Sequence, residues 1–469
     1  MNEHNTSSLA IGMVHFKTGD TDGVSLEMDK WKQVFTEAGH RVFFCCAERP
    51  NEVDAPFCTL LLSLSYLSEK TRKIEKGMFG SLEAYGNEEA FQKDLYADAK
   101  TIEQELVLWI KSCHLDVLIV ENLWSVALHP SASIALLHAI EQCSVQVLAH
   151  HHDFYWERVV PVSLTCKTAL EVADCFLPPH TKEFSHVVIN TKAQKALQLR
   201  KGIDADVIPN VFDFSQGPWE VDSFNADFRT SFGIKQDDVL LLQATRVIPR
   251  KGIELAIDFA NELQEKLKAC RGKTLYHGKV VSKTSNVVLV LSGSIVNDTS
   301  GYLDRLQKKA HENGVKLLWI GYQVASQRSL HEGKKTYSLW DAYAHADLVT
   351  YPSYWEGWGN QLLEAIRAKL PVVLFEYEIY RSDIAPSGMS MISLGDTLHS
   401  CGEDGLVQID QNILSKAADK AVDVLLDVQK RRDMVELNFA IAKKEFSLDT
   451  LRAMLEPYWV QWSKNIWSH

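Results

Sequence analysis

The chain has 469 residues, more than one ordinary hydrophobic core accommodates, so we expect two domains. Hydrophobic residues make up 46% and charged residues 23%, as in ordinary globular proteins, and a net charge of −12 argues against general nucleic-acid binding. No apolar run has the length of a membrane-spanning helix, the first residues do not form a signal peptide, and the cysteines are scattered. We therefore expect a cytoplasmic protein with reduced thiols and no membrane insertion.

The first half of the chain alternates between apolar strands and amphipathic helices. The run "LAIGMVHF" (9–16) predicts a buried strand, "LEMDKWKQVFTEAGH" (26–40) a helix and "RVFFCCA" (41–47) the next strand. Residues 50–105 are more polar and indicate an irregular insertion, after which "LDVLIVEN" and "VQVLAH" predict further strands. A βαβ opening of this kind predicts a parallel sheet covered by helices, in an N-terminal, acceptor-side domain spanning 1–213.

A second alternation follows a polar stretch at 214–238, which we interpret as a linker. The runs "VLLLQATRV", "NVVLVLSGSI", "VKLLWIGY", "ADLVTYPS" and "LPVVLFEY" predict strands of a C-terminal, nucleotide-sugar-binding domain at 239–445. The aromatic-rich segment 446–469 predicts a terminal helix that packs back toward the N-terminal domain. The predicted fold class is α/β, with two doubly wound, Rossmann-like domains facing a cleft. Ligands of such sheets bind at the carboxyl ends of the strands.

Two cations follow the first strand of the second domain. Arg246 and Lys251 lie between a predicted strand and a predicted helix, and Gly252 lies at the turn into that helix. A guanidinium, an ammonium and the free N–H groups of a helix start favour binding of a diphosphate. Solvated loop cations are the alternative interpretation of these residues alone.

Two carboxylates flank a glycine loop in "YPSYWEGWGNQLLEAIRAK", where Glu356 precedes Gly357 and Gly359, and Glu364 falls about one turn inside the next helix. Glycines allow backbone N–H groups to approach a ligand closely. The second carboxylate is suited to accept hydrogen bonds from a ribose diol, and the first from sugar hydroxyls. A helix cap with a solvated face is the alternative for an isolated pair of this spacing.

These elements together resemble the retaining glycosyltransferases of family 4, which have the GT-B fold. The resemblance rests on Arg246, Lys251 and "EGWGNQLLEA", and extends to "VIPNVFD" (207–213), "DAYAHADLVTYPS" (341–353) and "HHDF" (151–154). The stretches "YWEGWGNQ" and "FEYEIYRSDI" are similar to the mannosylglucosylglycerate-type synthases of that family. The resemblance covers most of the chain and is more specific in the second half.

The resemblance implies catalytic roles for Arg246, Lys251, Glu356 and His152. The two cations would neutralise the diphosphate leaving group, whose charge grows in the transition state. Glu356 would position the donor sugar, and His152 would lie near the anomeric centre. The leaving phosphate would act as the base, so no protein nucleophile is expected. The family neutralises the diphosphate with side chains rather than with Mg²⁺, so we expect an enzyme without cofactor that is independent of metal ions.

The resemblance also implies a donor-binding set in which Glu364 holds the nucleotide ribose. The other members of this set contribute backbone or side-chain groups near the donor: Gly357, Trp358, Gly359, Asn360 and Asp153.

Three consecutive histidines, His150, His151 and His152, leave open which ring faces the site. His152 is preferred because it directly precedes Asp153. A metal cluster is the alternative, but adjacent residues on a strand point to opposite faces, which opposes convergence of all three.

The first loop of the chain, "TGDTDGVSLEMDKW", is similar to a glycine-containing loop that faces donor and acceptor in the family. Gly19, Gly23 and Ser25 would line this acceptor and phosphate loop. Three further cations, Arg158, Lys182 and Arg381, have no place in the pattern and stand as surface charges or as groups for an anionic acceptor. Where the family has a Gly-Gly loop after the strand "LPVVLFEY", this chain reads "EYEIYRSDIAPSG", so donor contacts there are open.

The leading hypothesis is a retaining hexosyltransferase that moves a sugar from a UDP- or GDP-sugar to a hydroxyl of a small soluble or glycoside acceptor. The alternatives are a phosphosugar-using phosphorylase of the same fold and a non-catalytic protein that binds sugar or nucleotide. The expected partners are the donor and the acceptor, without nucleic acid. The sequence leaves open the donor base and sugar, the acceptor and the oligomeric state.

Overall fold

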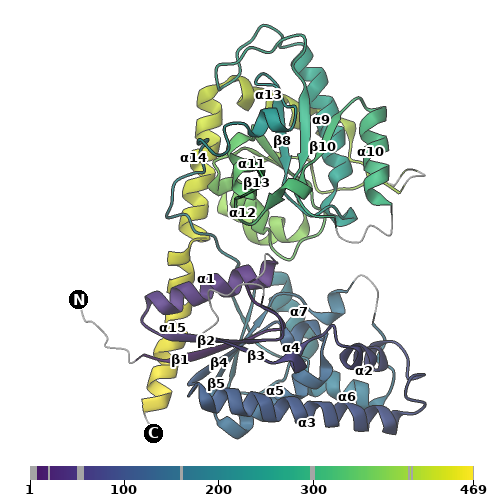
Figure 1. The fold of residues 1–469 in the computed structure, drawn as a ribbon, viewed down its shortest axis with the longest axis vertical. Helices are drawn as coiled ribbons and strands as arrows, with labels where there is room; N and C mark the ends of the chain where they lie inside the picture. Colours follow the sequence, from purple (N-terminus) through teal and green to yellow (C-terminus); the bar gives the residue numbers. More distant parts are fainter. Residues whose placement is uncertain are drawn as a thin grey trace. The chain divides into compact units, whose positions relative to one another are not determined.

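The computed structural model describes residues 8–19, 22–49, 57–158, 162–295, 301–399, 402 and 405–467, without the side chain of the last of these. Contacts divide the chain into two compact units. The first unit contains 1–211 together with 448–469, and the second contains 212–447. Each unit is a parallel sheet covered by helices (Figure 1), as the alternating pattern predicts.

A seven-stranded sheet forms the centre of the first unit, in the order β3-β2-β1-β4-β5-β6-β7. Its strands are β1 (Ala10–Val14), β2 (Arg41–Cys46), β3 (Cys58–Leu60), β4 (Val117–Glu121), β5 (Gln146–His151), β6 (Phe184–Val188) and β7 (Asp206–Val207). All described pairings are parallel, and β1 and β4 are buried along their whole length because helices cover both faces. The strand order reverses between β1 and β4, where doubly wound sheets bind their ligands.

Helices cover both faces of this sheet (Figure 1): α3 (Glu88–Ser112) and α5 (Pro130–Cys143) on one, α1 (Gly23–Glu37) and α15 (Leu448–Trp467) on the other. The apolar residues of α15 recur at helical spacing at Leu451, Leu455, Trp459 and Trp462, and they share a core with α1. The remaining helices are α2 (Glu69–Phe79), α4 (Leu123–Val126), α6 (Lys167–Phe176) and α7 (Thr191–Lys201).

The polar region at 50–105 is more regular than its composition predicts. It contains α2 and most of α3, a helix of 25 residues. Phe91, Leu95, Ile102 and Leu106 form the buried stripe of α3. The prediction of an irregular insertion was wrong here because charged residues on the exposed face concealed this stripe.

A six-stranded parallel sheet forms the second unit, in the order β10-β9-β8-β14-β15-β16. Its strands are β8 (Val239–Gln243), β9 (Val287–Leu291), β10 (Lys316–Trp319), β14 (Leu348–Tyr351), β15 (Val372–Leu374) and β16 (Ile392–Ser393). The strand order reverses between β8 and β14. The helices are α8 (Phe228–Ser231), α9 (Ile253–Lys268), α10 (Tyr302–Glu312), α11 (Leu339–His345), α12 (Asn360–Arg367), α13 (Gln411–Leu426) and α14 (Val428–Glu445).

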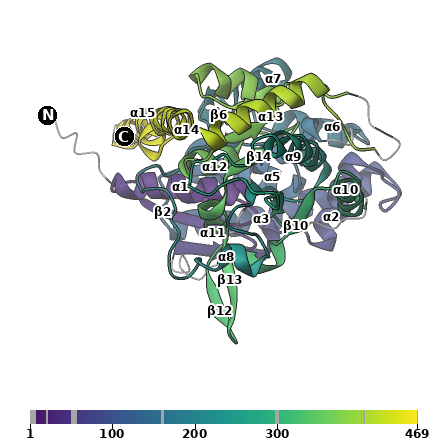
Figure 2. The same cartoon turned by 90° about the horizontal axis from the view of Figure 1, so that it is seen from above.

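A small three-stranded sheet is added to this unit by β11 (Val324–Ala325), β12 (Ser329–His331) and β13 (Lys334–Ser338). Figure 2 shows β12 and β13 as a hairpin that extends away from the rest of the second unit. The stretch expected as a linker, 214–238, packs within the second unit: Phe228 is fully buried, and the Arg229 guanidinium forms an ion pair of 2.8 Å with Asp347.

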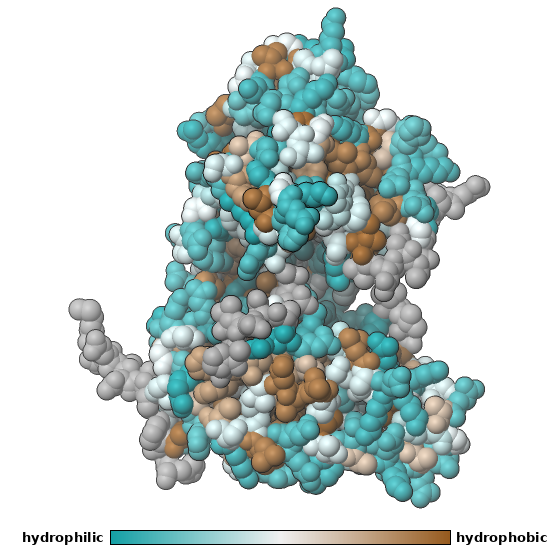
Figure 3. Space-filling model, in the orientation of Figure 1, coloured by the Kyte–Doolittle hydropathy of each residue, from teal (hydrophilic) through white to brown (hydrophobic). Residues whose placement is uncertain are grey.

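Hydrophilic side chains cover most of the face drawn in Figure 3, and apolar ones occur there in small groups. Among the residues that the structure describes, no helix combines the length and the hydropathy needed to cross a membrane.

Candidate active site

The loops that follow β8 and β14 meet at the point where the strand order of the second sheet reverses. Gly252 has a φ of 60°, and a Cβ atom added to it would lie 2.3 Å from the carbonyl oxygen of Pro352. The N–H group of Tyr354 donates to the carbonyl of Arg250 at 3.1 Å. Only glycine therefore allows the turn after Lys251 to pack this closely against the loop after β14.

A buried ion group joins these two loops. The ammonium of Lys251 donates to Oε1 of Glu356, and Nη1 of Arg250 lies 2.9 Å from Oε2 of the same carboxylate. Arg250 also donates to the carbonyl of Trp355 at 2.9 Å and lies 5.1 Å from the centre of its ring. The side chains of Lys251 and Glu356 are only 5% and 9% exposed, so their interaction is shielded from water.

The electrostatics of this group leave it positively charged. Burial lowers the pKa of Lys251, and the Glu356 carboxylate opposes that shift. Burial acts to raise the pKa of Glu356, but Lys251 and Arg250 outweigh it and the net pKa falls below the usual value. Arg246 lies exposed in the same loop and contributes to lowering the pKa of Lys251, so its charge is close by. Three cations thus accompany one carboxylate, an excess suited to an anionic ligand.

The glycine element follows Glu356 and leads into α12, which begins at Asn360. Gly359 has a φ of 152°, and a Cβ atom there would lie 2.4 Å from the hydroxyl oxygen of Tyr377. That hydroxyl donates to the carbonyl of Trp358 at 2.5 Å, and the Trp358 ring is buried in edge-to-face contact with Phe446. The contacts of Trp358 with Tyr377 and Phe446 therefore fix the backbone between Gly357 and Asn360.

Glu364 is buried on α12, where its Oε2 accepts a hydrogen bond of 3.0 Å from the hydroxyl of Tyr343. Burial and this carboxylate raise the pKa of Tyr343 well above its usual value, so the phenol remains a donor at any ordinary pH. Tyr343 lies on α11, and the position of that helix therefore sets the position of the Glu364 carboxylate.

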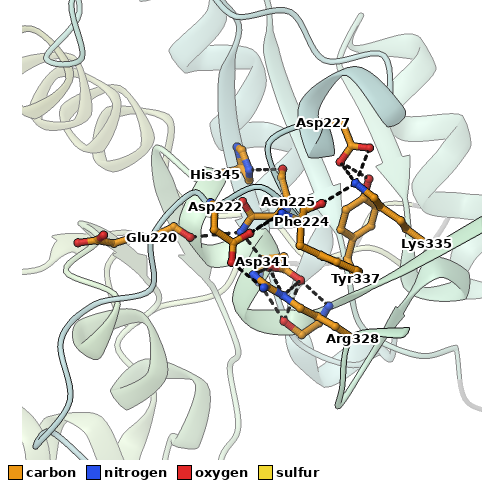
Figure 4. Close-up of polar contacts among 11 residues, drawn as sticks. Glu220, Asp222, Phe224, Asn225, Asp227, Arg328, Lys335, Tyr337, Asp341 and His345 are labelled. Carbon is orange, nitrogen blue, oxygen red and sulfur yellow. Dashed lines mark hydrogen bonds and ion pairs between the residues drawn. The ribbon is translucent and has the colours of Figure 1, made fainter. Parts of the chain in front are cut away.

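A polar network holds α11 in place (Figure 4). The carboxylate of Asp341, in the first turn of α11, accepts from Ser338, from Nε of Arg328 at 3.0 Å and from Nδ2 of Asn225 at 2.8 Å. Figure 4 also shows Lys335 of β13 bonded to Asp227, at 2.9 Å. The stretch before α8 and the hairpin are thereby tied to α11, the helix that carries the partner of Glu364.

The three consecutive histidines at the end of β5, His150, His151 and His152, point in two opposite directions. His150 and His152 both approach the carboxylate of Glu121, with ring nitrogens 2.9 and 3.3 Å from Oε2. His151 points the other way, and its Nε2 lies 3.0 Å from Nδ1 of His186. The alternation of a strand therefore separates the histidines, as expected.

Backbone contacts fix His152 and Asp153. Their N–H groups donate to Oδ1 of Asn122, at 3.0 and 3.1 Å. Asn122 follows β4 and has a φ of 56°. Its side chain therefore links the loop after β4 to the loop after β5.

The first loop places Asp22 as the N-cap of α1, accepting from the N–H groups of Val24 and Ser25. The hydroxyl of Ser25 is buried and donates to Asp22 at 2.7 Å, and Lys17 lies 3.3 Å from the same carboxylate. Gly19 has a φ of 72°, and Gly23 begins the helix. The Ser25 hydroxyl is thus engaged locally, while the backbone of the two glycines remains the part suited to a ligand.

Sequence comparisons place the chain among known enzymes. Residues 224–388 match the family described as glycosyl transferases group 1. The chain is 38% identical to mannosylglucosylglycerate synthase of Petrotoga mobilis over 423 residues, which are 90% of this chain and 94% of that protein. It is also 38% identical to the synthase of the same name from Thermotoga maritima over 451 residues, 95% and 99% of the two chains. The chain belongs to the group 1 glycosyltransferases.

Solved structures agree on the fold of this glycosyltransferase. A glycosyltransferase from Rickettsia africae matches with a TM-score of 0.63 at 12% identity, over 98% of this chain and all of that one. Sucrose-phosphate synthase from Thermosynechococcus elongatus matches with a TM-score of 0.62 at 14% identity, over 97% and 98%. At such identities the likeness shows the fold alone, which is the GT-B fold predicted from the sequence.

In the second unit of the glycosyltransferase, the residues predicted from the sequence lie together: Lys251 and Glu356 in contact, Arg246 beside them, and Glu364 one turn into α12. In the first unit, His152 and Asp153 follow β5, while Gly19, Gly23 and Ser25 surround the start of α1. The roles assigned to these residues stay predictions.

Several residues of the glycosyltransferase were missed by sequence reasoning: Arg250, Tyr343, Glu121 and Asn122. Arg250 adjoins a predicted cation, and Glu121 and Asn122 end a predicted strand, so proximity to the motifs was the available signal. Two of the three unplaced cations are engaged, Arg158 with Glu75 at 2.7 Å and Arg381 with Asp396 at 2.6 Å, and Lys182 is exposed.

One ligand-type atom from each of Glu121, His150 and His152 lies within 4.8 Å of the others, a spacing that metal centres also show. Nε2 of His152 bonds to Oε2 of Glu121, however, and Nδ1 of His150 makes an ion-pair contact of 2.9 Å with the same oxygen. We therefore interpret the group as a polar network of the glycosyltransferase, and its independence of metal ions stays a prediction.

Proposed function

We propose that the protein transfers a mannosyl group from a nucleoside-diphosphate-mannose to a hydroxyl of glucosylglycerate, with retention of anomeric configuration. The glycosyltransferase family supports the class of reaction, and the name mannosylglucosylglycerate synthase, borne by two relatives that are 38% identical over at least 90% of this chain, supports the choice of sugar and acceptor. The observation that supports a nucleoside-diphosphate donor is the cluster of Arg246, Arg250 and Lys251 near Glu356, which is suited to bind an anion at the carboxyl ends of β8 and β14.

In this proposal the cations bind the diphosphate and stabilise the charge that develops on it as the glycosidic bond breaks. Glu364, held by the Tyr343 hydroxyl, accepts from the ribose diol. The N–H groups of the Gly357–Asn360 stretch hold hydroxyls of the donor sugar or oxygens of the diphosphate. A leaving phosphate oxygen takes the proton of the acceptor hydroxyl, so no protein nucleophile is required.

The cations also support transfer without a metal ion, because they supply the positive charge that a divalent cation would otherwise bring to the diphosphate. Turnover should therefore continue in excess EDTA. A loss of turnover in EDTA that Mg²⁺ restores would refute independence of metal ions without touching the rest of the proposal.

The function is tested in two steps. A thermal-shift series with UDP, GDP, ADP and dTDP names the donor base, because a ligand that binds only the folded state raises the melting temperature. The matching nucleoside-diphosphate-mannose and glucose are then each incubated with glucosylglycerate and with glycerate alone. We expect a mannosylated product from glucosylglycerate, with the anomeric configuration of the donor by NMR. Transfer of glucose, or use of glycerate in place of its glucoside, would contradict the proposed sugar or acceptor.

A further inference from the structure

A buried carboxylate lies at the carboxyl edge of the first sheet, where the strand order reverses. Glu121 ends β4 and is fully buried. Its Oε2 lies 2.9 Å from Nδ1 of His150 and 3.3 Å from Nε2 of His152, and its backbone carbonyl lies 2.7 Å from Nδ1 of His15, which follows β1. Within the part of the chain that the structure describes, Oε1 has no hydrogen-bond partner. Three imidazoles thus surround one glutamate.

The same loop fixes the backbone of His152. Oδ1 of Asn122 accepts from the N–H groups of His152 and Asp153, and it also accepts from the Ser125 hydroxyl at 2.8 Å. The N–H group of Asn122 donates to the carbonyl of His150 at 2.8 Å. Backbone and side chain of His152 are therefore both held by the residues that end β4, a preorganised arrangement.

The Glu121 carboxylate of this network carries negative charge at neutral pH. Burial acts to raise the pKa of Glu121, but the two imidazoles outweigh it and lower the pKa to about 2. Burial lowers the pKa of His15 to about 4 and also lowers that of His150. The other charged groups that act on these imidazoles are acidic: Glu27 of α1, which pairs with Lys30, and Asp22 at its N-cap, which pairs with Lys17.

We propose that Glu121 is a positioning residue for His152: its carboxylate fixes the orientation and tautomer of the imidazole and places negative potential behind it, so that His152 stabilises the positive charge that develops on the donor sugar. This inference rests on the proposed function. In the step concerned, the bond from the anomeric carbon to the diphosphate oxygen breaks and its electron pair stays on that oxygen. The acceptor oxygen bonds to the same carbon, and its proton passes to the leaving phosphate.

The geometry makes a definite statement about the tautomer. A carboxylate only accepts hydrogen bonds, so Nε2 of His152 must carry the proton directed at Glu121, and Nδ1 keeps its lone pair. An interaction with a cationic transition state lowers the barrier without strengthening donor binding, so its loss falls on kcat rather than on KM.

The test uses the full chain with Glu121→Gln, which keeps the size of the side chain and removes its charge. The matched control is Glu103→Gln, a buried glutamate of the same unit on α3 that bonds to Lys100 and Gln142. We expect kcat to fall roughly 100-fold in Glu121→Gln, with KM for the donor nearly unchanged. The control should keep the kcat of the wild type.

Nitrogen-15 NMR of the imidazoles supplies a readout that does not depend on turnover, with the His152 signal assigned by its loss in His152→Gln. The wild type should show the tautomer with the proton on Nε2, and Glu121→Gln a mixture of both. A wild-type His152 with its proton on Nδ1, a normal kcat in Glu121→Gln, or a stoichiometric metal ion in the purified protein would each overturn the inference alone. Absence of sugar transfer by the wild type would instead overturn the proposed function, and this inference with it.

Discussion

The ammonium of Lys251 donates to the carboxylate of Glu356 across two loops that are separated by more than a hundred residues in sequence. Both side chains are buried, and Arg250 bonds to the same carboxylate. Lys251 and Glu356 therefore do not act independently on the diphosphate and the sugar. The carboxylate orients the ammonium, and two cations keep the carboxylate ionised.

Replacement of Lys251 should lower both the turnover and the stability of the protein. Lys251→Ala is expected to lower kcat at least about 100-fold, because a charge aimed at the leaving group is lost. It should also destabilise the second unit, because the buried Glu356 carboxylate loses its ion pair with Lys251. Melting temperature and steady-state turnover measure the two effects.

The double variant Lys251→Met with Glu356→Gln removes both charges and should recover melting temperature without recovering turnover. Lys268→Ala, at an exposed cation of α9, serves as the control and should match the wild type in both measurements. Near-normal turnover in Lys251→Ala would exclude the role of Lys251 at the diphosphate.

Glu364 should discriminate nucleotides by their ribose. In Glu364→Gln the charge that strengthens hydrogen bonds from the diol is lost, and we expect the preferred nucleoside diphosphate to bind about 10- to 100-fold more weakly. The 2′,3′-dideoxy analogue should bind the variant and the wild type equally well. Tyr343→Phe removes the hydroxyl that holds Oε2 and should give a smaller loss.

Calorimetric titration of both nucleotides measures these affinities. Glu265→Gln, an exposed glutamate on α9, controls for the change of charge. Equal losses for the nucleotide and its dideoxy analogue in Glu364→Gln would place the carboxylate away from the ribose.

Much of the fold was readable from the sequence, because both faces of a central parallel strand must be apolar. The runs that became β1, β4, β8 and β9 are fully buried, as their composition predicts. α3 was missed because its charged face dominates the composition, although its apolar residues have helical spacing. The spacing of apolar residues thus predicts secondary structure better than the average composition of a segment does.

The candidate site was readable only in part, because motifs name residues but not their partners. The sequence offered Arg246 and Lys251 as equivalent cations, whereas in the structure Lys251 is buried against Glu356 and Arg246 is exposed. The involvement of Arg250 depends on how two distant loops pack. The sequence likewise did not show that His150 and His152 share Glu121, on a neighbouring strand, as a partner.

Acid should destabilise the first unit in a window set by buried histidines. Burial lowers the pKa of His15 and of His186 from 6.5 to about 4. Unfolding returns both to their usual value, so between pH 6.5 and 4 the unfolded chain binds more protons than the folded one. The free energy of unfolding should therefore fall as the pH falls through this window, by up to about 3 kcal/mol for each histidine.

Glu121 extends this dependence to lower pH, because its pKa of about 2 lies below the usual 4.5 and its stabilisation is lost below pH 4.5. Melting temperatures of the wild type, His186→Asn and the exposed-site control His331→Asn, taken between pH 7.5 and 4 in small steps, test the prediction. The slope between pH 6.5 and 4 should be shallower in His186→Asn alone. Parallel slopes in all three proteins would show that His186 does not contribute.

Gly252 should not tolerate a side chain, because a Cβ atom there would clash with the neighbouring loop. Gly278 is the control that separates this clash from the strain of a positive φ. Gly252 and Gly278 both have positive φ, 60° and 87°, so alanine at either position costs roughly 1–2 kcal/mol of backbone strain. A Cβ atom at Gly278 meets nothing within 4 Å, whereas at Gly252 it would lie 2.3 Å from the Pro352 carbonyl oxygen. Gly252→Ala must therefore also push apart the loops that carry Lys251 and Glu356.

We expect Gly278→Ala to lower the melting temperature slightly and to keep its turnover, and Gly252→Ala to lower both. The difference between the two variants measures the close approach of the loops rather than the strain of a positive φ, because the strain is common to both. Equal melting temperatures and equal turnover would mean that the loops separate without cost, and the ion pair of Lys251 and Glu356 would then not depend on the turn between β8 and α9.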